Sequence, residues 1–214
     1  KVDVIPNAID PKKYQTSTNR GIVRQRYGVG WGEKLILCVG RLVPQKGVEY
    51  FIRAIPKISK SYPEAKYVIV GDGWSRDLLE SEAQKSGYSN RIKFTGFAPD
   101  KEVVDLMNSA DVLVVPSIYE PFGIVALEGM ASGVPIVASK VDGLAEVLEH
   151  NKTGILFEKQ SSKAVQDAVH EFEKKRDLFN PKYIRRGVQR FSKDTFRKKY
   201  KNFVDKCIKE FYYS

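Results

Sequence analysis

Short runs rich in β-branched and aliphatic residues recur along this chain, and a helical pattern separates each run from the next. We predict strands at six of these runs, which cover residues 35–39, 66–70, 92–95, 112–115, 136–138 and 154–157. The helical patterns between them cover residues 48–61, 75–86, 101–110, 123–132 and 144–149. Parallel strands need a long crossover between them, and a helix commonly supplies it. The sequence therefore predicts an α/β fold with a Rossmann-like parallel sheet of about six strands flanked by helices.

Residues beyond 158 follow a helical pattern throughout, with breaks near Asn180-Pro181 and Ser192. We expect residues 1–158 to form the Rossmann-like sheet domain and residues 159–214 to add helices that pack on it. Of the net charge of +10, the first part holds 20 basic and 19 acidic residues, whereas the second holds 16 and 7. The excess in the second part indicates solvated helices, with an acidic membrane surface or an acidic neighbouring domain as alternatives.

Several kinds of site are disfavoured by composition. The two cysteines (Cys38 and Cys207) and the two histidines (His150 and His170) form no motif, so we expect no metal site built on them. No platform of interleaved aromatic and basic residues indicates nucleic-acid binding. No apolar run reaches the ~18 residues of a membrane span and no signal peptide precedes the first strand, so we expect a reducing, cytoplasmic compartment.

Polar residues and glycines follow the predicted strands, at the edge where an open parallel sheet binds its ligands. The candidates at this carboxyl edge are Gly40, Arg41, Lys46, Gly71, Asp72, Gly73, Phe97, Glu120, Pro121, Phe122, Gly123, Ile124, Asp142 and Gly143. Arg41 and Lys46 suit a diphosphate, since one offers a fork of donors and the other a point charge. Their loop is not a Walker A sequence. Gly71-Asp72-Gly73 is only a fragment of a dinucleotide fingerprint, because Arg76 stands at the third glycine position.

Glu120 and Glu128 flank the start of the predicted helix at Gly123. They invite comparison with the acid and base of a glycoside hydrolase, but one lies in the loop and the other more than a turn into the helix. We expect their separation to exceed the ~5–9.5 Å that such pairs need. The pattern instead favours a nucleotide-sugar as ligand. Free N–H groups at a helix start can bind its phosphates, and two carboxylates beside them can accept hydrogen bonds from its hydroxyl groups.

These residues resemble the carboxy-terminal, donor-binding domain of the retaining glycosyltransferases of family 4, which have the GT-B fold and include glycogen synthases. The resemblance rests on Val4-Ile5-Pro6-Asn7-Ala8-Ile9-Asp10, Gly40-Arg41 with Lys46-Gly47, Val70-Gly71-Asp72-Gly73, Glu120-Pro121-Phe122-Gly123 with Glu128, and Thr153-Gly154. It implies a hexosyltransferase that uses a nucleoside diphosphate-sugar, with glucose as the expected sugar.

The resemblance also implies a role for each matching residue. Arg41 and Lys46 would hold the diphosphate and stabilise the leaving group, and Glu120 would bind sugar hydroxyls near the reacting carbon. Glu128 would bind the ribose hydroxyls. The remaining donor-binding positions would be Gly40, Gly71, Asp72, Gly73, Phe97, Pro121, Phe122, Gly123 and Ile124. No metal or other cofactor is expected, because two cations would supply the charge that Mg²⁺ supplies elsewhere.

Members of this family also have an amino-terminal domain that holds the acceptor, and we expect that domain to be missing here. The isolated chain would then bind the donor but transfer weakly or not at all. We interpret an aromatic stripe in the last helix as core packing, with part of it exposed where the missing domain would lie: Phe196, Tyr200, Phe203, Cys207 and Phe211. A nucleotide-sugar epimerase or hydrolase and a binding-only module of the same fold remain alternatives.

Overall fold

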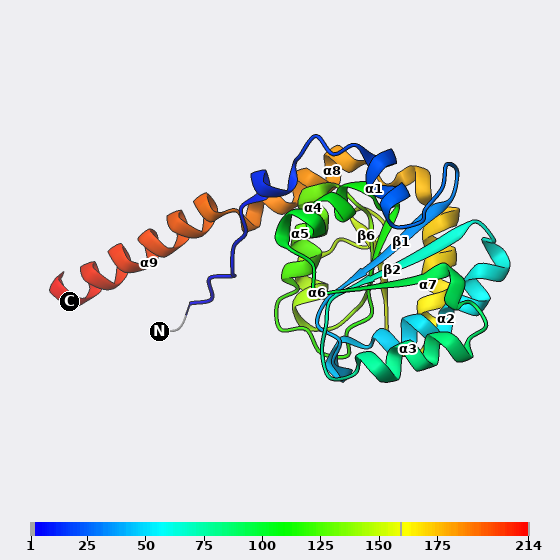
Figure 1. Ribbon diagram of the computed structural model, residues 1–214. Coiled ribbons are helices and arrows are strands. Elements are labelled where there is room, and N and C mark those ends of the chain that lie inside the picture. Colours follow the sequence, from blue (N-terminus) through cyan, green and yellow to red (C-terminus); the bar gives the residue numbers. More distant parts are fainter. Residues whose placement is uncertain (1–2, 159, 214) are drawn as a thin grey trace.

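The computed structural model describes residues 3–158 and 160–213 and contains one parallel sheet (Figure 1). The strand order is β3-β2-β1-β4-β5-β6. The strands are β1 (Lys34–Val39), β2 (Ala65–Val70), β3 (Ile92–Gly96), β4 (Val112–Val115), β5 (Ile136–Ser139) and β6 (Gly154–Phe157). All six predicted strands are therefore present, each within one residue of its expected bounds, and the predicted Rossmann-like α/β fold is confirmed.

Helices cover both faces of the sheet. One group consists of α2 (Val48–Ser61), α3 (Arg76–Lys85) and α7 (Ser162–Lys174), in which α2 packs against the other two. The other group consists of α1 (Arg20–Arg26), α4 (Asp100–Ser109), α5 (Ile124–Ser132), α6 (Asp142–Val147) and α8 (Pro181–Gly187). The chain changes face between β3 and β4, so β1 and β4 lie side by side while their following helices lie on opposite faces. Open parallel sheets bind their ligands in a crevice at such a switch point.

The central strands are buried on both faces, which explains their continuous apolar sequence. Leu35, Leu37 and all four residues of β4 are fully or almost fully buried. Helix α5 approaches β4 closely at Gly129, where a Cβ atom would lie 2.7 Å from Cδ2 of Leu113. Tight packing at this point holds α5 along β4, and α5 begins in the loop that follows β4, where the candidate site lies.

A proline inside a helix commonly kinks or shortens it, but α2, which contains Pro56, keeps its predicted bounds from Val48 to Ser61. The sequence gives no prediction for α1, a helix of seven residues in which only Val23 is buried. It begins at Asn19, whose side chain accepts a hydrogen bond from the N–H of Ile22. An asparagine cap is the signal that could have located this helix.

Helix α9 (Lys193–Tyr213) extends away from the rest of the protein, beside the N-terminal segment (Figure 1). Its aromatic stripe is not part of the core, because Tyr200 and Phe211 are exposed and Phe196 and Phe203 are half-buried. The interpretation as core packing is therefore wrong for this stripe, and exposure of part of it is confirmed. The N-terminal segment is held at the start of α9 by the N–H of Ile9, which donates to Phe191, and by the N–H of Lys193, which donates to Ile9.

Helices α7 and α8 pack on the sheet domain, whereas α9 does not. The division into residues 1–158 and 159–214 stays a prediction, as does a membrane contact through the basic helices at the C-terminal end. Among the described residues, no helix combines the length and the apolar character that a membrane span requires.

Candidate functional site

The loops after β1 and β4 meet at the switch point of the sheet. The backbone N–H groups of Ile118 and Tyr119 both donate to the carbonyl of Gln45, at 2.9 and 3.3 Å. At Gly47, which has φ of +60°, a Cβ atom would lie 2.1 Å from the carbonyl oxygen of Pro116. The two loops are therefore in direct backbone contact, and only glycine fits at the closest point.

Lys46 and Glu120 form an ion pair across these loops. Nζ of Lys46 lies 2.5 Å from Oε2 of Glu120, and Oγ of Ser117 lies 3.4 Å from the same oxygen. The Glu120 side chain is almost fully buried, whereas Lys46 is partly exposed. The structure thus brings together two of the predicted site residues, and Lys46 keeps further donors on its ammonium group.

Arg41 lies in the same loop as Lys46 but is exposed to solvent. Within residues 3–158 and 160–213, its guanidinium group has no hydrogen bond or ion pair. Its backbone position is set by its neighbours, because Gly40 donates to Val70 at 3.0 Å and Leu42 donates to Asp72 at 2.8 Å. The backbone at Arg41 is therefore held in place, while its guanidinium group remains unpaired, among the described residues, at the edge of the crevice.

Gly71 and Gly73 let the loop after β2 pass against the loop after β1. A Cβ atom on Gly71 would lie 1.9 Å from the carbonyl oxygen of Gly40, and one on Gly73 would lie 2.4 Å from that of Leu42. Asp72 between them is exposed and accepts from the N–H of Gly73 at 2.7 Å and from Arg76 at 3.2 Å. These glycines therefore permit a close approach between two backbone segments.

The remaining crevice positions lie further along the same edge. The Phe97 side chain after β3 is exposed. Helix α5 begins at Ile124, one residue later than predicted, with Gly123 as its cap at φ of +84°. Gly143 at the start of α6 lies against this turn, since a Cβ atom there would be 2.3 Å from Cα of Phe122.

The start of α5 carries backbone donors without acceptors. Pro121 and Ile124 are exposed, and Phe122 is half-buried beside them. No acceptor is found among the described residues for the N–H groups of Phe122, Gly123 and Ile124. These donors, with the positive end of the helix dipole, can bind an anion at this point of the crevice.

Glu128 has a separate environment, one turn further along α5. Its Oε1 accepts a hydrogen bond of 2.6 Å from the hydroxyl of Tyr14, which belongs to the 3-10 helix Pro11–Tyr14. Burial raises the pKa of Glu128 above its ordinary value, and the Tyr14 hydrogen bond opposes this effect. Among the described residues, no hydrogen bond links Glu128 to Glu120. Tyr14 was not predicted from the sequence, since 114 residues separate it from Glu128.

A metal centre is not evident in this part of the molecule. Within the described ranges, no three side chains of His, Cys, Asp or Glu gather where they could hold a metal ion. The charged side chains at this edge of the sheet are instead Arg41, Lys46, Asp72, Glu120 and Asp142. Independence from a metal stays a prediction.

Comparison with known sequences identifies related proteins for most of the chain. The family model "Glycosyl transferases group 1" matches residues 19–190. An uncharacterized glycosyltransferase of Methanocaldococcus jannaschii is 47% identical over 158 residues, which are 72% of this chain and 40% of that protein. The glycogen synthase of Mycobacterium tuberculosis is 35% identical over 72% of this chain and 36% of its own length.

A third relative has a sugar donor in its name. The GDP-mannose-dependent α-(1-6)-phosphatidylinositol monomannoside mannosyltransferase of Mycobacterium tuberculosis is 33% identical over 82% of this chain and 48% of its own length. The chain thus spans less than half the length of these three relatives.

Solved structures agree with this result. The HepE protein of Anabaena, in complex with UDP-glucose, superposes with a TM-score of 0.85 and 28% identity, over 95% of this chain and 57% of that one. The C-terminal domain of LpcC, a glycosyl transferase group 1 family protein of Francisella tularensis, has a TM-score of 0.74 and 28% identity, over 84% of this chain and 96% of that one. This chain belongs to the group 1 family of glycosyltransferases and has the Rossmann-like sheet of the GT-B structures in that family.

Proposed function

We propose that the crevice at the carboxyl edge binds a nucleoside diphosphate-sugar, as the donor site of a hexosyltransferase. The observation that carries this proposal is the combination of cations and free backbone donors in one crevice. Arg41 is uncommitted, Lys46 has donors left beside its Glu120 bond, and the N–H groups at the start of α5 have no acceptor among the described residues. A diphosphate would satisfy all three groups. The UDP-glucose complex of HepE supports this ligand class.

In this proposal, the two cations do most of the chemical work. Cleavage of the bond between sugar and diphosphate leaves negative charge on the phosphate oxygens, and Arg41 and Lys46 would stabilise that charge without a metal ion. Lys46 is already held in place by Glu120. Glu120 would in turn accept hydrogen bonds from hydroxyl groups of the sugar near the reacting carbon, with Pro121, Phe122 and Gly123 beside it.

Glu128 would bind the ribose hydroxyls through the oxygen that Tyr14 leaves free. Glucose is the proposed sugar, transfer with retention of configuration is the proposed outcome, and family 4 is the proposed subfamily. A glycan is the proposed acceptor. Its binding site would lie in a domain corresponding to the part of the relatives that this chain does not match.

The epimerase or hydrolase alternative has no support in the position of the histidines. Nδ1 of His150 accepts a hydrogen bond from the N–H of Leu156, and the His170 ring packs edge-on against Tyr62 at 5.5 Å. Neither histidine belongs to the loops that form the crevice. An acid or base from these residues is therefore not available to the bound sugar.

Titration calorimetry with UDP-, ADP- and GDP-glucose tests the donor proposal. We expect one of the three to bind, and Arg41→Ala or Lys46→Ala to weaken it by about 1–3 kcal/mol through loss of charge-assisted hydrogen bonds. Lys163→Ala is the matched control, because Lys163 pairs with Asp167 on the surface of α7. Unchanged affinity in both crevice variants would exclude the diphosphate role.

The role of Glu128 has its own test. Glu128→Ala should weaken binding of the nucleotide-sugar but spare inorganic pyrophosphate, since pyrophosphate has no ribose. Equal losses for both ligands would refute the ribose assignment. Retention is tested on a protein that also has the acceptor domain, by determining the anomeric configuration of its product with NMR.

A further inference from the structure

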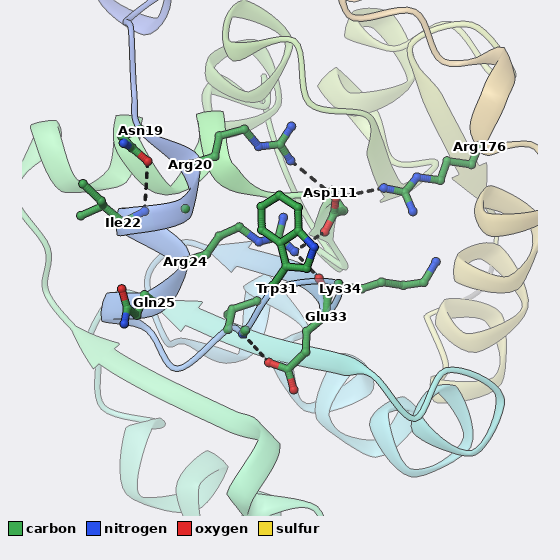
Figure 2. A pocket seen from close by; sticks show the side chains of 14 residues that line it. Asn19, Arg20, Ile22, Arg24, Gln25, Trp31, Glu33, Lys34, Asp111 and Arg176 are labelled. Atoms are coloured by element: carbon green, nitrogen blue, oxygen red, sulfur yellow. Dashed lines mark hydrogen bonds and ion pairs between the residues drawn. The ribbon is translucent and has the colours of Figure 1, made fainter.

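A second recess lies at the opposite edge of the sheet, at the amino ends of β1 and β4 (Figure 2). It has a volume of about 1080 Å³, and its lining includes Arg20, Arg24, Trp31, Asp111 and Arg176. Lys34 begins β1 and Asp111 immediately precedes β4, whereas the donor loops follow the other ends of these strands. The length of a strand, roughly 15–20 Å, therefore separates this recess from the crevice at the carboxyl edge.

Three arginines surround Asp111 in this recess. Oδ2 of Asp111 accepts from Arg24 at 3.0 Å and from the N–H of Leu35 at 2.8 Å. Oδ1 accepts from Arg176 at 3.0 Å, and Arg20 lies 3.5 Å from the same oxygen. Figure 2 shows these arginines approaching Asp111 from different sides. The Asp111 side chain is 8% exposed, so it is an internal anchor for their guanidinium groups.

Positive charge exceeds negative charge around this anchor. One carboxylate faces three guanidinium groups, while Lys34 is paired with Glu173 and Glu33 with Lys66. Arg20 and Arg176 are about half exposed, and each contacts Asp111 through only one of its terminal nitrogens. Both therefore direct unused donors to the solvent side of the recess, where a dianion would balance the excess charge.

A smaller hollow of about 310 Å³ adjoins the recess and shares Arg20, Asp111 and Arg176 with it. Two buried polar atoms at this hollow, Oγ of Ser132 and Nε of Arg185, have no hydrogen-bond partner among the residues that the structure describes. Ser132 is 3% exposed. Buried polar groups nearly always form hydrogen bonds in folded proteins. These two donors therefore indicate that a ligand could supply a hydrogen-bond acceptor on this side of the cluster.

Trp31 lies at the same recess and is fully exposed. A large exposed aromatic beside a cationic recess offers a flat apolar surface to a ligand. We propose that this recess binds a small ligand that combines a phosphate with a ring. Its phosphate lies between Arg20 and Arg176, and its ring lies against Trp31. This site is independent of the donor crevice and does not rest on the proposed transferase activity.

A purely structural role explains only part of the cluster. Arg20 and Arg24 also donate to carbonyl groups at the end of α4, those of Ser109 and Ala110, and so hold α1 against α4. Arg176 makes no such contact; among the described residues, its side chain forms hydrogen bonds and ion pairs with Asp111 alone. Arg176 is therefore the position at which binding can be tested with little effect on the fold.

The fluorescence of Trp31 provides a direct readout. The chain has only two tryptophans, so Trp74→Phe leaves Trp31 as the single tryptophan. In this background, inorganic phosphate at constant ionic strength should change the emission in a saturable way. Arg176→Gln should raise the dissociation constant about tenfold through loss of a charge-assisted contact. Phenyl phosphate should bind at least about threefold more tightly than inorganic phosphate, because its ring can contact Trp31.

Two control variants separate this site from other cations. Arg186→Gln removes an exposed arginine on α8, and Lys46→Gln removes a cation of the donor crevice. Both should leave the phosphate titration unchanged. A linear response that sodium chloride reproduces, or an equal weakening by Arg186→Gln, would overturn the proposal. Weakening by Lys46→Gln but not by Arg176→Gln would place the phosphate in the donor crevice instead, and equal affinity for the two probes would remove Trp31 from the site.

Discussion

The two edges of the parallel sheet are formed by different atoms, main-chain atoms at the carboxyl edge and side-chain atoms at the amino edge. At the carboxyl edge, loops touch through their backbones, and Gly47, Gly71 and Gly143 each lie where a Cβ atom would clash with another main-chain segment. At the amino edge, long side chains reach across the gap, and three arginines meet on Asp111. The first edge is therefore defined by main-chain geometry and the second by side-chain charge.

This difference bears on how each edge can change. A crevice lined by backbone N–H groups keeps its donors whatever side chains stand nearby, provided that the glycines are present. Related proteins with differently named donors, GDP-mannose in one case and UDP-glucose in another, can share such a framework. A recess lined by side chains can lose or gain charge by single substitutions. Variants at the two edges should therefore differ in size of effect and in cause.

The largest loss of stability should follow Gly71→Ala. The new Cβ atom would lie 1.9 Å from the carbonyl oxygen of Gly40, at φ of +129°, so the loops must move apart. We expect a loss of at least about 3 kcal/mol in the free energy of unfolding, measured with urea. Gly87→Ala is the control, because φ there is +75° but nothing lies within 4 Å. It should cost about 1–2 kcal/mol; equal losses at both glycines would mean that the close loop contact is unimportant.

A smaller loss should follow Asp111→Asn at the other edge. The amide keeps the shape and one acceptor, but three guanidinium groups lose their counter-charge. We expect a loss of about 2–3 kcal/mol, below the cost of breaking a fully buried pair because Arg20 and Arg176 remain partly solvated. Asp167→Asn removes an exposed carboxylate that pairs with Lys163, and it should change the unfolding energy by less than about 0.5 kcal/mol. Similar values for the two variants would show that Asp111 does not organise this edge.

The smallest effect should come from Glu128→Gln, and its sign depends on pH. Glu128 is a carboxylate that lacks the arginines of Asp111 and has the Tyr14 hydroxyl instead. Burial raises its pKa in the folded state. Ionisation therefore costs stability as the pH rises from the ordinary value through the raised one, and this cost is absent at lower pH.

The glutamine variant should accordingly be more stable than the original protein near pH 8 and no more stable near pH 4. Thermal unfolding across this range measures the difference. Glu146→Gln, at an exposed position of α6, serves as the control and should leave the pH profile unchanged. If Glu128→Gln stabilised the protein, relative to the original, more near pH 4 than near pH 8, that result would contradict the burial of this carboxylate.

Strands and the carboxyl edge could be predicted because they depend on local pattern. Runs of β-branched and aliphatic residues located all six strands, and the parallel arrangement placed Arg41, Lys46 and Glu120 at one edge. The structure shows Lys46 and Glu120 in contact. Helix α1 was missed because only Val23 of its seven residues is buried, which leaves no apolar face to detect.

Contacts between distant segments could not be predicted. Tyr14 meets Glu128 and Arg176 meets Asp111 only after folding, and no motif joins either pair. The helical periodicity of α9 correctly indicated an amphipathic helix. Periodicity does not reveal which surface covers the apolar face, so the stripe from Phe196 to Phe211 was wrongly assigned to the core.

The exposure of α9 has a thermodynamic consequence for the whole chain. Beyond its first turns, this helix of 21 residues is stabilised by its own hydrogen bonds, by local pairs such as Lys201 with Asp205, and by an exposed pair between Lys206 and Asp3 of the N-terminal segment. Isolated helices of this length are only partly formed in water. Heating should therefore unwind α9 well before the sheet loses its packing, and the protein should not unfold in a single two-state transition. A surface that covered the aromatic stripe would join the two events into one, so the cooperativity of unfolding reports whether α9 is covered.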